Sequence, residues 1–401
     1  MRNFIWEIRK NPLRPWVLLV VICVMLLLNS YVGTNKIQRL TAAITDEYQT
    51  GFDLVYSKVE GPITLENMQW IVSEYSRLNE IIQSGQFSTE EDRTNTYTGY
   101  VFQDSFLFEQ LYEDAKYAFE YGSNAEKIAL TAAENAQFYF PRGNTGLSER
   151  YTTMAKAFQD RKISSFYRTE GWMSYFTYEF SNLMIMLAVL IGVSTMFSLE
   201  WELGTKTLLQ VTLNGNDRAR KSKLLSAAVY IWGVTTIFSI QDFLRFALYY
   251  GFRGFGNPLY AISELSETIL NISIGKFLVF NYAVKLLGIC VFAIQILLLS
   301  AVVKSNIYAF GGGLAVLALQ IVADAFCLKV SMLPLLNSAQ LCAVFEGTTI
   351  GGNFVPNLYL QILIQVGIGV CCGLLLSIID KDVFPRKRKE VGHVPTHKMA
   401  N

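Results

Sequence analysis

The chain has 401 residues, of which 52% are hydrophobic and only 17% are charged. The hydrophobic share lies above, and the charged share below, the values typical of soluble globular proteins. The formal net charge is +1, so there is no basic field, and nucleic acid is excluded as an expected partner.

The first predicted unit covers residues 1–34. Residues 1–14 are amphipathic and basic, and residues 16–32 are a charge-free apolar run of 17 residues. The basic stretch fits a helix lying in the interface of an anionic leaflet, and equally a simple positive flank of the next segment. The apolar run is long enough to span a bilayer, and no small-residue cleavage site follows it. We therefore interpret it as a retained membrane anchor.

Residues 35–174 form a polar insert with 13 basic and 20 acidic side chains, a net charge of −7. Apolar residues recur at helical spacing over residues 63–83 and 104–121, which predicts a helical domain. Its many aromatic residues fit either the core of that domain or a surface for an amphipathic ligand. Long domains are translocated largely regardless of charge, so we expect this one to be extracytoplasmic.

Five further apolar segments follow, and each is long enough to span a membrane. They cover residues 176–197, 224–243, 277–303, 307–325 and 358–379. Six spans place both chain ends on one side of the membrane. The segments on that side carry net charges of +3 (1–15), +2 (199–223) and +3 (380–401), which by the positive-inside rule makes them cytoplasmic.

The predicted fold is therefore a mainly α membrane protein with six transmembrane helices, a helical extracytoplasmic domain, an N-terminal interfacial helix and a cytoplasmic coupling helix. Residues 175–379 carry spans two to six, and residues 380–401 form a basic cytoplasmic tail. Residues 251–275 and 327–357 contain apolar stretches too short to span, and we expect re-entrant or interfacial helices there. The protein is expected to be multi-pass in a cell membrane, surrounded by membrane lipids.

Motifs for catalysis are absent from the sequence. It contains no P-loop and no H-E-x-x-H zinc motif, and its two histidines, His393 and His397, lie in the tail. We therefore expect no enzyme activity, no metal site and no cofactor in this chain. Of the six cysteines, Cys327 and Cys342 could pair, although buried free thiols are the favoured interpretation.

Ionisable residues within or beside spans are candidates for function, because they are costly in a membrane. Those near the predicted outer side are Glu179, Asp242, Arg245, Lys285 and Asp324. One interpretation is an outer gate or substrate path. The other is snorkelling combined with local ion pairs.

Residues 197–223 form a polar stretch of 27 residues between two spans, far longer than a connection needs. Its residues in the pattern F-x-x-E-x-E-x-G-T-x-x-x-L-L-x-x-T…R…K are Phe197, Glu200, Glu202, Gly204, Thr205, Leu208, Leu209, Thr212, Arg218 and Lys223. This pattern, with the six-span order, resembles the signature loop of ABC-2 type transporter permeases. One departure is Leu213, where many members have proline.

The resemblance implies an export permease that binds a separate ABC ATP-binding subunit, in which ATP and Mg²⁺ act, and pairs with a second permease, either a copy or a relative. It implies that residues 204–213 form a coupling helix. The coupling residues would be Glu200, Glu202, Gly204, Thr205, Leu208, Leu209 and Arg218.

The expected substrate of such an exporter is a peptide, toxin, antibiotic or lipid-like molecule, and the cysteine-free outer domain favours a bacterial cell surface. The alternative is a mechanotransmitting or sensory membrane protein whose outer domain acts on a partner without translocating a substrate.

Overall fold

The computed structural model describes residues 15–40, 46–85, 96–206 and 215–382. The fold is mainly helical, and the described residues contain six helices long and apolar enough to cross a membrane. The prediction of a mainly α, multi-pass membrane protein is confirmed. The predicted interfacial helix and most of the basic tail lie outside the described residues, as does most of the predicted coupling helix.

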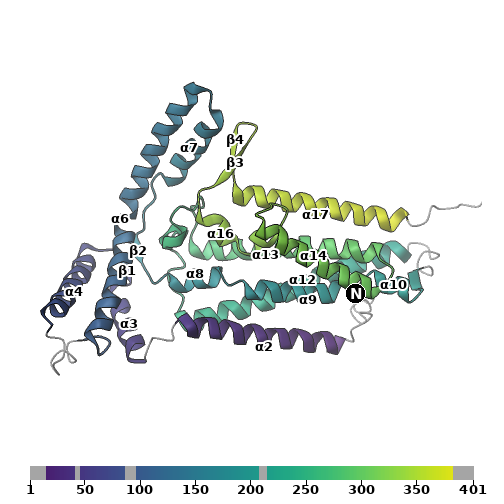
Figure 1. Cartoon of the computed structure of the whole chain (residues 1–401), viewed down its shortest axis with the longest axis horizontal. Coiled ribbons are helices and arrows are strands. Elements are labelled where there is room, and N and C mark those ends of the chain that lie inside the picture. The colour runs from purple at the N-terminus through teal and green to yellow at the C-terminus, as the bar shows by residue number, and fades with distance from the viewer. Residues whose placement is uncertain (1–14, 41–45, 86–95, 207–214, 383–401) are drawn as a thin grey trace, which may run out of the picture.

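The six candidate spans lie side by side, with their long axes horizontal in Figure 1. Helices α9 and α13 form much of the bundle core. The elements of the spans are α2 (Pro15–Leu40), α8 (Glu170–Phe176), α9 (Phe180–Val193), α10 (Ser198–Glu202), α12 (Gly215–Tyr250), α13 (Ile274–Val302), α14 (Asn306–Ala325) and α17 (Asn357–Asp382). The second span is thus three consecutive helices, whereas the sequence predicts one.

Close packing at a glycine joins α14 to α9. A Cβ atom added at Gly313 would collide with the side chain of Leu190, which is fully buried in the core. The absence of a side chain at Gly313 therefore allows α14 and α9 to approach closely.

The domain between the first two spans contains α3 (Asp46–Val59), α4 (Leu65–Ser84), the long α6 (Val101–Tyr139), the short η1 (Phe140–Arg142) and α7 (Thr145–Phe158). Strands β1 (Gly61–Pro62) and β2 (Ser165–Phe166) pair antiparallel. Some of its aromatic residues, such as Phe108 and Tyr121, are buried in the core, whereas Phe102, Phe106 and Phe119 are exposed.

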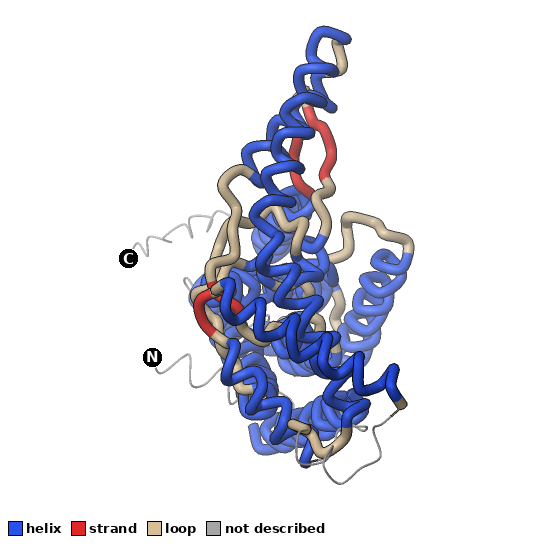
Figure 2. Tube along the Cα trace, turned by 90° about the vertical axis from the view of Figure 1, so that its left-hand side faces the viewer, coloured by secondary structure: helices blue, strands red, loops and turns tan. Residues whose placement is uncertain are grey.

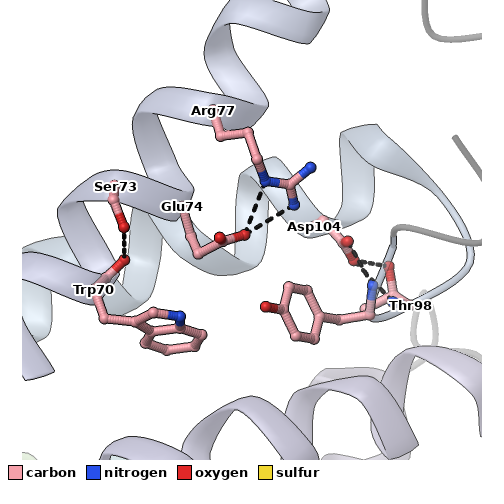
Figure 3. Close-up of polar contacts among 7 residues, drawn as sticks. Trp70, Ser73, Glu74, Arg77, Thr98 and Asp104 are labelled. Atoms are coloured by element: carbon pink, nitrogen blue, oxygen red, sulfur yellow. Dashed lines mark hydrogen bonds and ion pairs between the residues drawn. The ribbon is translucent and has the colours of Figure 1, made fainter.

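The start of α6 is held by one carboxylate (Figure 3). Asp104 is fully buried and accepts hydrogen bonds from the backbone N–H groups of Tyr97 (2.7 Å) and Thr98 (2.8 Å), and from the Thr98 hydroxyl (2.5 Å). A negative charge in the first turn also complements the helix dipole. Figure 3 further shows Arg77 bound to Glu74 on α4, with a nitrogen–oxygen distance of 2.8 Å.

The prediction of a helix within residues 251–275 is wrong. This segment forms only two short 3₁₀ turns, η2 (Leu259–Ala261) and η3 (Ser263–Leu265). Its backbone carbonyls are bonded from outside: the hydroxyl of Tyr117 donates to Tyr260 O (2.7 Å) and that of Tyr121 to Ser266 O (2.8 Å). Because α6 satisfies these carbonyls, the segment needs no helix to pair them.

Residues 327–357 form two short helices, α15 (Leu333–Leu336) and α16 (Ser338–Ala343), and then a hairpin of β3 (Gly347–Ile350) and β4 (Asn353–Pro356). The hairpin is not among the expected elements. Its turn is Gly351–Gly352, both with positive φ, a pair that favours tight hairpin turns. Figure 2 shows the hairpin strands beside the arm formed by α6 and α7.

The span bundle has two ends. The domain end is the end that adjoins the domain formed by α3, α4, α6 and α7. The loop end is the opposite one, where α10 lies and where residues 207–214 connect α10 to α12 (Figure 1).

Candidate functional site

The short helix α10 connects several spans at the loop end. The backbone N–H groups of Phe197 and Ser198 both donate to the hydroxyl of Ser300 on α13, at 3.1 and 3.2 Å. The Ser198 hydroxyl donates to Asn306 Oδ1, at the start of α14 (2.8 Å). We call α10 with these contacts the loop-end hub.

Both glutamates among the predicted coupling residues belong to this hub. Glu200 is only 5% exposed and forms an ion pair with Lys223 of α12, with 2.8 Å between Oε1 and Nζ. Lys223 also donates to Met196 O (2.6 Å). Glu202 accepts from the backbone N–H of Asn306 (3.1 Å), where a carboxylate complements the N-terminus of α14. The two glutamates thus link α10 to α12 and α14.

The remaining coupling candidates lie at the edge of the hub. Gly204 has φ +67°, and a Cβ atom there would meet nothing within 4 Å. The Thr205 hydroxyl donates to Glu200 O (3.4 Å). Arg218 is exposed on α12. Leu208 and Leu209 lie outside the described residues. Gly204 therefore presents an open surface, whereas Glu200 faces inward.

The five ionisable residues predicted near the outer side do not meet in one place. Asp242 and Arg245 pair on α12, with 3.6 Å between their charged atoms, as their spacing predicts. Lys285 is buried on α13 and interacts electrostatically with Asp242. These three residues form a polar cluster inside the span bundle. Glu179 and Asp324 line a separate pocket at the domain end.

The polar cluster includes a residue that the sequence reasoning missed. Asn29 of α2 is fully buried; its amide donates to Asp242 Oδ1 (2.8 Å) and Gln241 Oε1 (2.9 Å), and its Oδ1 accepts from the Tyr178 hydroxyl (3.0 Å). The signal was present, because Asn29 is a polar residue in an apolar span. The cluster thus ties α2 to α12.

The pocket at the domain end has a volume of about 620 Å³. Its walls come from the start of α9, the end of α14, and the short helices α15 and α16. Glu179 lies at the N-terminus of α9 and Asp324 near the C-terminus of α14. We call it the domain-end pocket.

All six cysteines are free in the structure, including Cys327 and Cys342. Cys342 is buried, and burial raises the pKa of its thiol to about 12, which keeps it protonated at neutral pH. The favoured interpretation of buried free thiols thus holds for Cys342, whereas Cys327 is free but exposed. Within the described ranges, no group of three or more His, Cys, Asp or Glu residues could hold a metal ion.

Comparisons of the chain with family models, with curated proteins and with solved structures find no match. Function must therefore be inferred from the geometry of this chain's own residues.

Proposed function

We propose that this chain is the membrane subunit of an ATP-driven ABC exporter. ATP and Mg²⁺ act in a separate ATP-binding subunit, which docks at the loop end, and a second permease completes the assembly. On this proposal the loop end is cytoplasmic, and the α3–α7 domain lies outside a bacterial cell.

The observation that carries the proposal is the loop-end hub. A displacement of α10 would be transmitted to α12 through Lys223, to α13 through Ser300 and to α14 through Asn306. A motor acting on the stretch after Glu202 would therefore act on three spans. The resemblance of this same stretch to a coupling loop supports the proposal independently.

The geometry suggests different roles for the coupling residues. Glu200, buried in its ion pair with Lys223, would transmit movement within the membrane subunit. Gly204 and Arg218, which lie at the surface, would meet the partner. The partner can shift the conformational equilibrium only by binding one arrangement of the spans more tightly than the other.

One observation favours the second candidate function, mechanical transmission without transport. The outer domain is joined to the connection between α12 and α13 by hydrogen bonds from Tyr117, Tyr121 and Arg161, the last donating to Thr268 O (2.6 Å). Movement of the spans would therefore reach the domain. ATP-dependent transport of a labelled peptide in proteoliposomes would separate the two functions.

The main test compares two glycine substitutions. Gly204 and Gly251 both have positive φ (+67° and +60°) and open space at Cβ, so arginine costs about 1 kcal/mol of backbone strain at each. They differ in place, since Gly204 lies at the loop end and Gly251 at the domain end. We expect Gly204→Arg to lower ATP hydrolysis by the complex purified from native membranes by about tenfold, the effect of about 1.4 kcal/mol.

Gly251→Arg serves as the matched control and should keep the wild-type rate. Both variants should insert into the membrane like the wild type, and because their backbone strain is similar they should melt at similar temperatures, as measured by thermal unfolding of the purified chain. Equal hydrolysis by wild type and Gly204→Arg would reject the coupling assignment.

A further inference from the structure

The domain-end pocket has the size and lining of a ligand site. Its volume of about 620 Å³ falls within the range of small-molecule pockets, about 300–1,000 Å³. Phe180, Leu183 and Met186 of α9 and Ile321 of α14 line it with apolar surface. An occupant can therefore bury a hydrophobic body here.

The side-chain amides of two buried asparagine residues line the same pocket, and in each only the nitrogen is hydrogen-bonded. Asn182 and Asn337 are each 6% exposed. The amide nitrogen of Asn182 donates to Leu336 O (3.1 Å), and that of Asn337 donates to Glu179 Oε1 (2.9 Å). These bonds orient both amides, and the Oδ1 atom of each has no hydrogen-bond partner. A buried acceptor left unpaired is costly, so both oxygens favour an occupant that donates.

The charged groups of the pocket have the same preference. Glu179 Oε1 accepts from Asn337 and from Gln340 Nε2 (3.3 Å), and the Glu179 and Asp324 carboxylates repel each other. Within the described ranges neither carboxylate forms an ion pair. Lys36 interacts electrostatically with Glu179, but its ammonium lies over the Tyr178 ring, 5.6 Å from the centroid. A positive group in the pocket would relieve the repulsion.

We propose that the domain-end pocket binds an amphipathic cation: an ammonium or guanidinium group that donates to Glu179, Asp324, Asn182 and Asn337, attached to an apolar body that lies along α9. This inference rests on the proposed function, because it names the substrate class that the exporter would recognise. The cation could belong to a free amine or peptide, or to the headgroup of an aminolipid in the membrane.

The test uses dansylcadaverine, a fluorescent primary amine, and the full chain in nanodiscs of phosphatidylglycerol, which has no amino group. Saturable binding is expected. An alcohol analogue of the probe should bind about tenfold or more weakly, because one hydrogen bond to a charged group is worth about 1.5–3 kcal/mol. A carboxylate analogue should not bind. Equal affinity for amine and alcohol would overturn the proposal.

Substitutions in the pocket test separately whether binding depends on its charge and on its volume. Asp324→Asn, at a carboxylate that accepts no hydrogen bond and forms no ion pair within the described ranges, should weaken binding about tenfold, whereas Glu267→Gln, an exposed carboxylate outside the pocket, should not. Leu183→Trp should block the pocket without changing its charge. Glu179→Gln could disturb the bonds from Asn337 and Gln340, so Asp324→Asn is the deciding variant. Unchanged binding in Asp324→Asn and Leu183→Trp would refute the site.

A competition experiment identifies the source of the cation. If phosphatidylethanolamine added to the nanodisc displaces the probe, the natural occupant is an aminolipid; if it does not, the occupant is a free amine. Either result supports the site. Binding is measured without ATP or the partner subunit, so its failure leaves the Gly204 comparison standing, and failure of that comparison leaves the binding result standing.

Discussion

Most of the charged residues buried between the spans lie close to opposite charges. Glu200 pairs with Lys223, Asp242 pairs with Arg245, and Lys285 interacts electrostatically with Asp242. An unpaired charge is costly away from water, so the Glu200–Lys223 pair favours the observed contact of α10 with α12. At the loop end, the pair that joins α10 to α12 is also the one that the proposed coupling would use.

A double-mutant cycle tests that pair. Lys223→Met leaves the Glu200 carboxylate buried without its partner and should lower the free energy of unfolding by about 3 kcal/mol. Adding Glu200→Gln should restore part of that loss, because the uncompensated charge is removed. The measurement is equilibrium unfolding of the purified chain, with exposed Arg218→Met as a control that changes stability by about 0.5 kcal/mol or less. Additive effects of the two single variants would show that the residues are not coupled.

The β3–β4 hairpin joins the domain to the last span. Phe345, just before β3, stacks on Phe354 of β4, with 5.5 Å between ring centroids, and lies 6.3 Å from Phe158 of α7. Arg150 of α7 donates to Phe345 O (3.5 Å). The domain is therefore attached to the bundle both through the α12–α13 connection and through the segment that enters α17.

A disulfide can test this attachment. A Cβ atom placed on Gly146 of α7 lies 3.3 Å from the Thr349 Cβ on β3, close to the distance that a disulfide needs. In a chain with its native cysteines replaced, Gly146→Cys/Thr349→Cys should form the bond on mild oxidation, seen as a gel shift that reductant reverses. Gly146→Cys/Thr348→Cys is the control. It should not bridge, because neighbouring strand residues face opposite sides and Thr348 binds Lys329. Equal bridging of both pairs would contradict the register.

At the scale of the whole molecule, charge is unevenly distributed along the sequence. The predicted outside insert carries −7, while the three predicted inside segments are each positive. The proposed docking of an ATP-binding subunit depends on this orientation, since the partner must reach the loop end from the cytoplasm.

Cysteine labelling tests the orientation. In the same cysteine-replaced background, Asn124→Cys lies on exposed α6 in the domain, and Arg218→Cys lies at the exposed loop end. A membrane-impermeant maleimide applied to intact cells should label Asn124→Cys at once. It should label Arg218→Cys only after permeabilisation, because positive segments are retained in the cytoplasm. The opposite pattern would place the loop end outside and exclude a cytoplasmic motor there.

The sequence by itself determined the six spans and the helical domain. Both follow from local properties: the length of an apolar run and the period of its side chains. The stretch after Phe197 could also be singled out, because its length and polarity are visible without any contact.

Only the tertiary structure decided which distant residues meet. It divided five predicted outer residues between a polar cluster and a pocket, turned Glu200 inward onto Lys223, and brought Asn182 beside Asn337. It also replaced the expected helix in residues 251–275 with turns, because side chains of α6 bond the carbonyls of that segment. The contacts of Tyr121 with Ser266 and of Asn182 with Leu336 join residues more than 100 positions apart, and local periodicity carries no information about them.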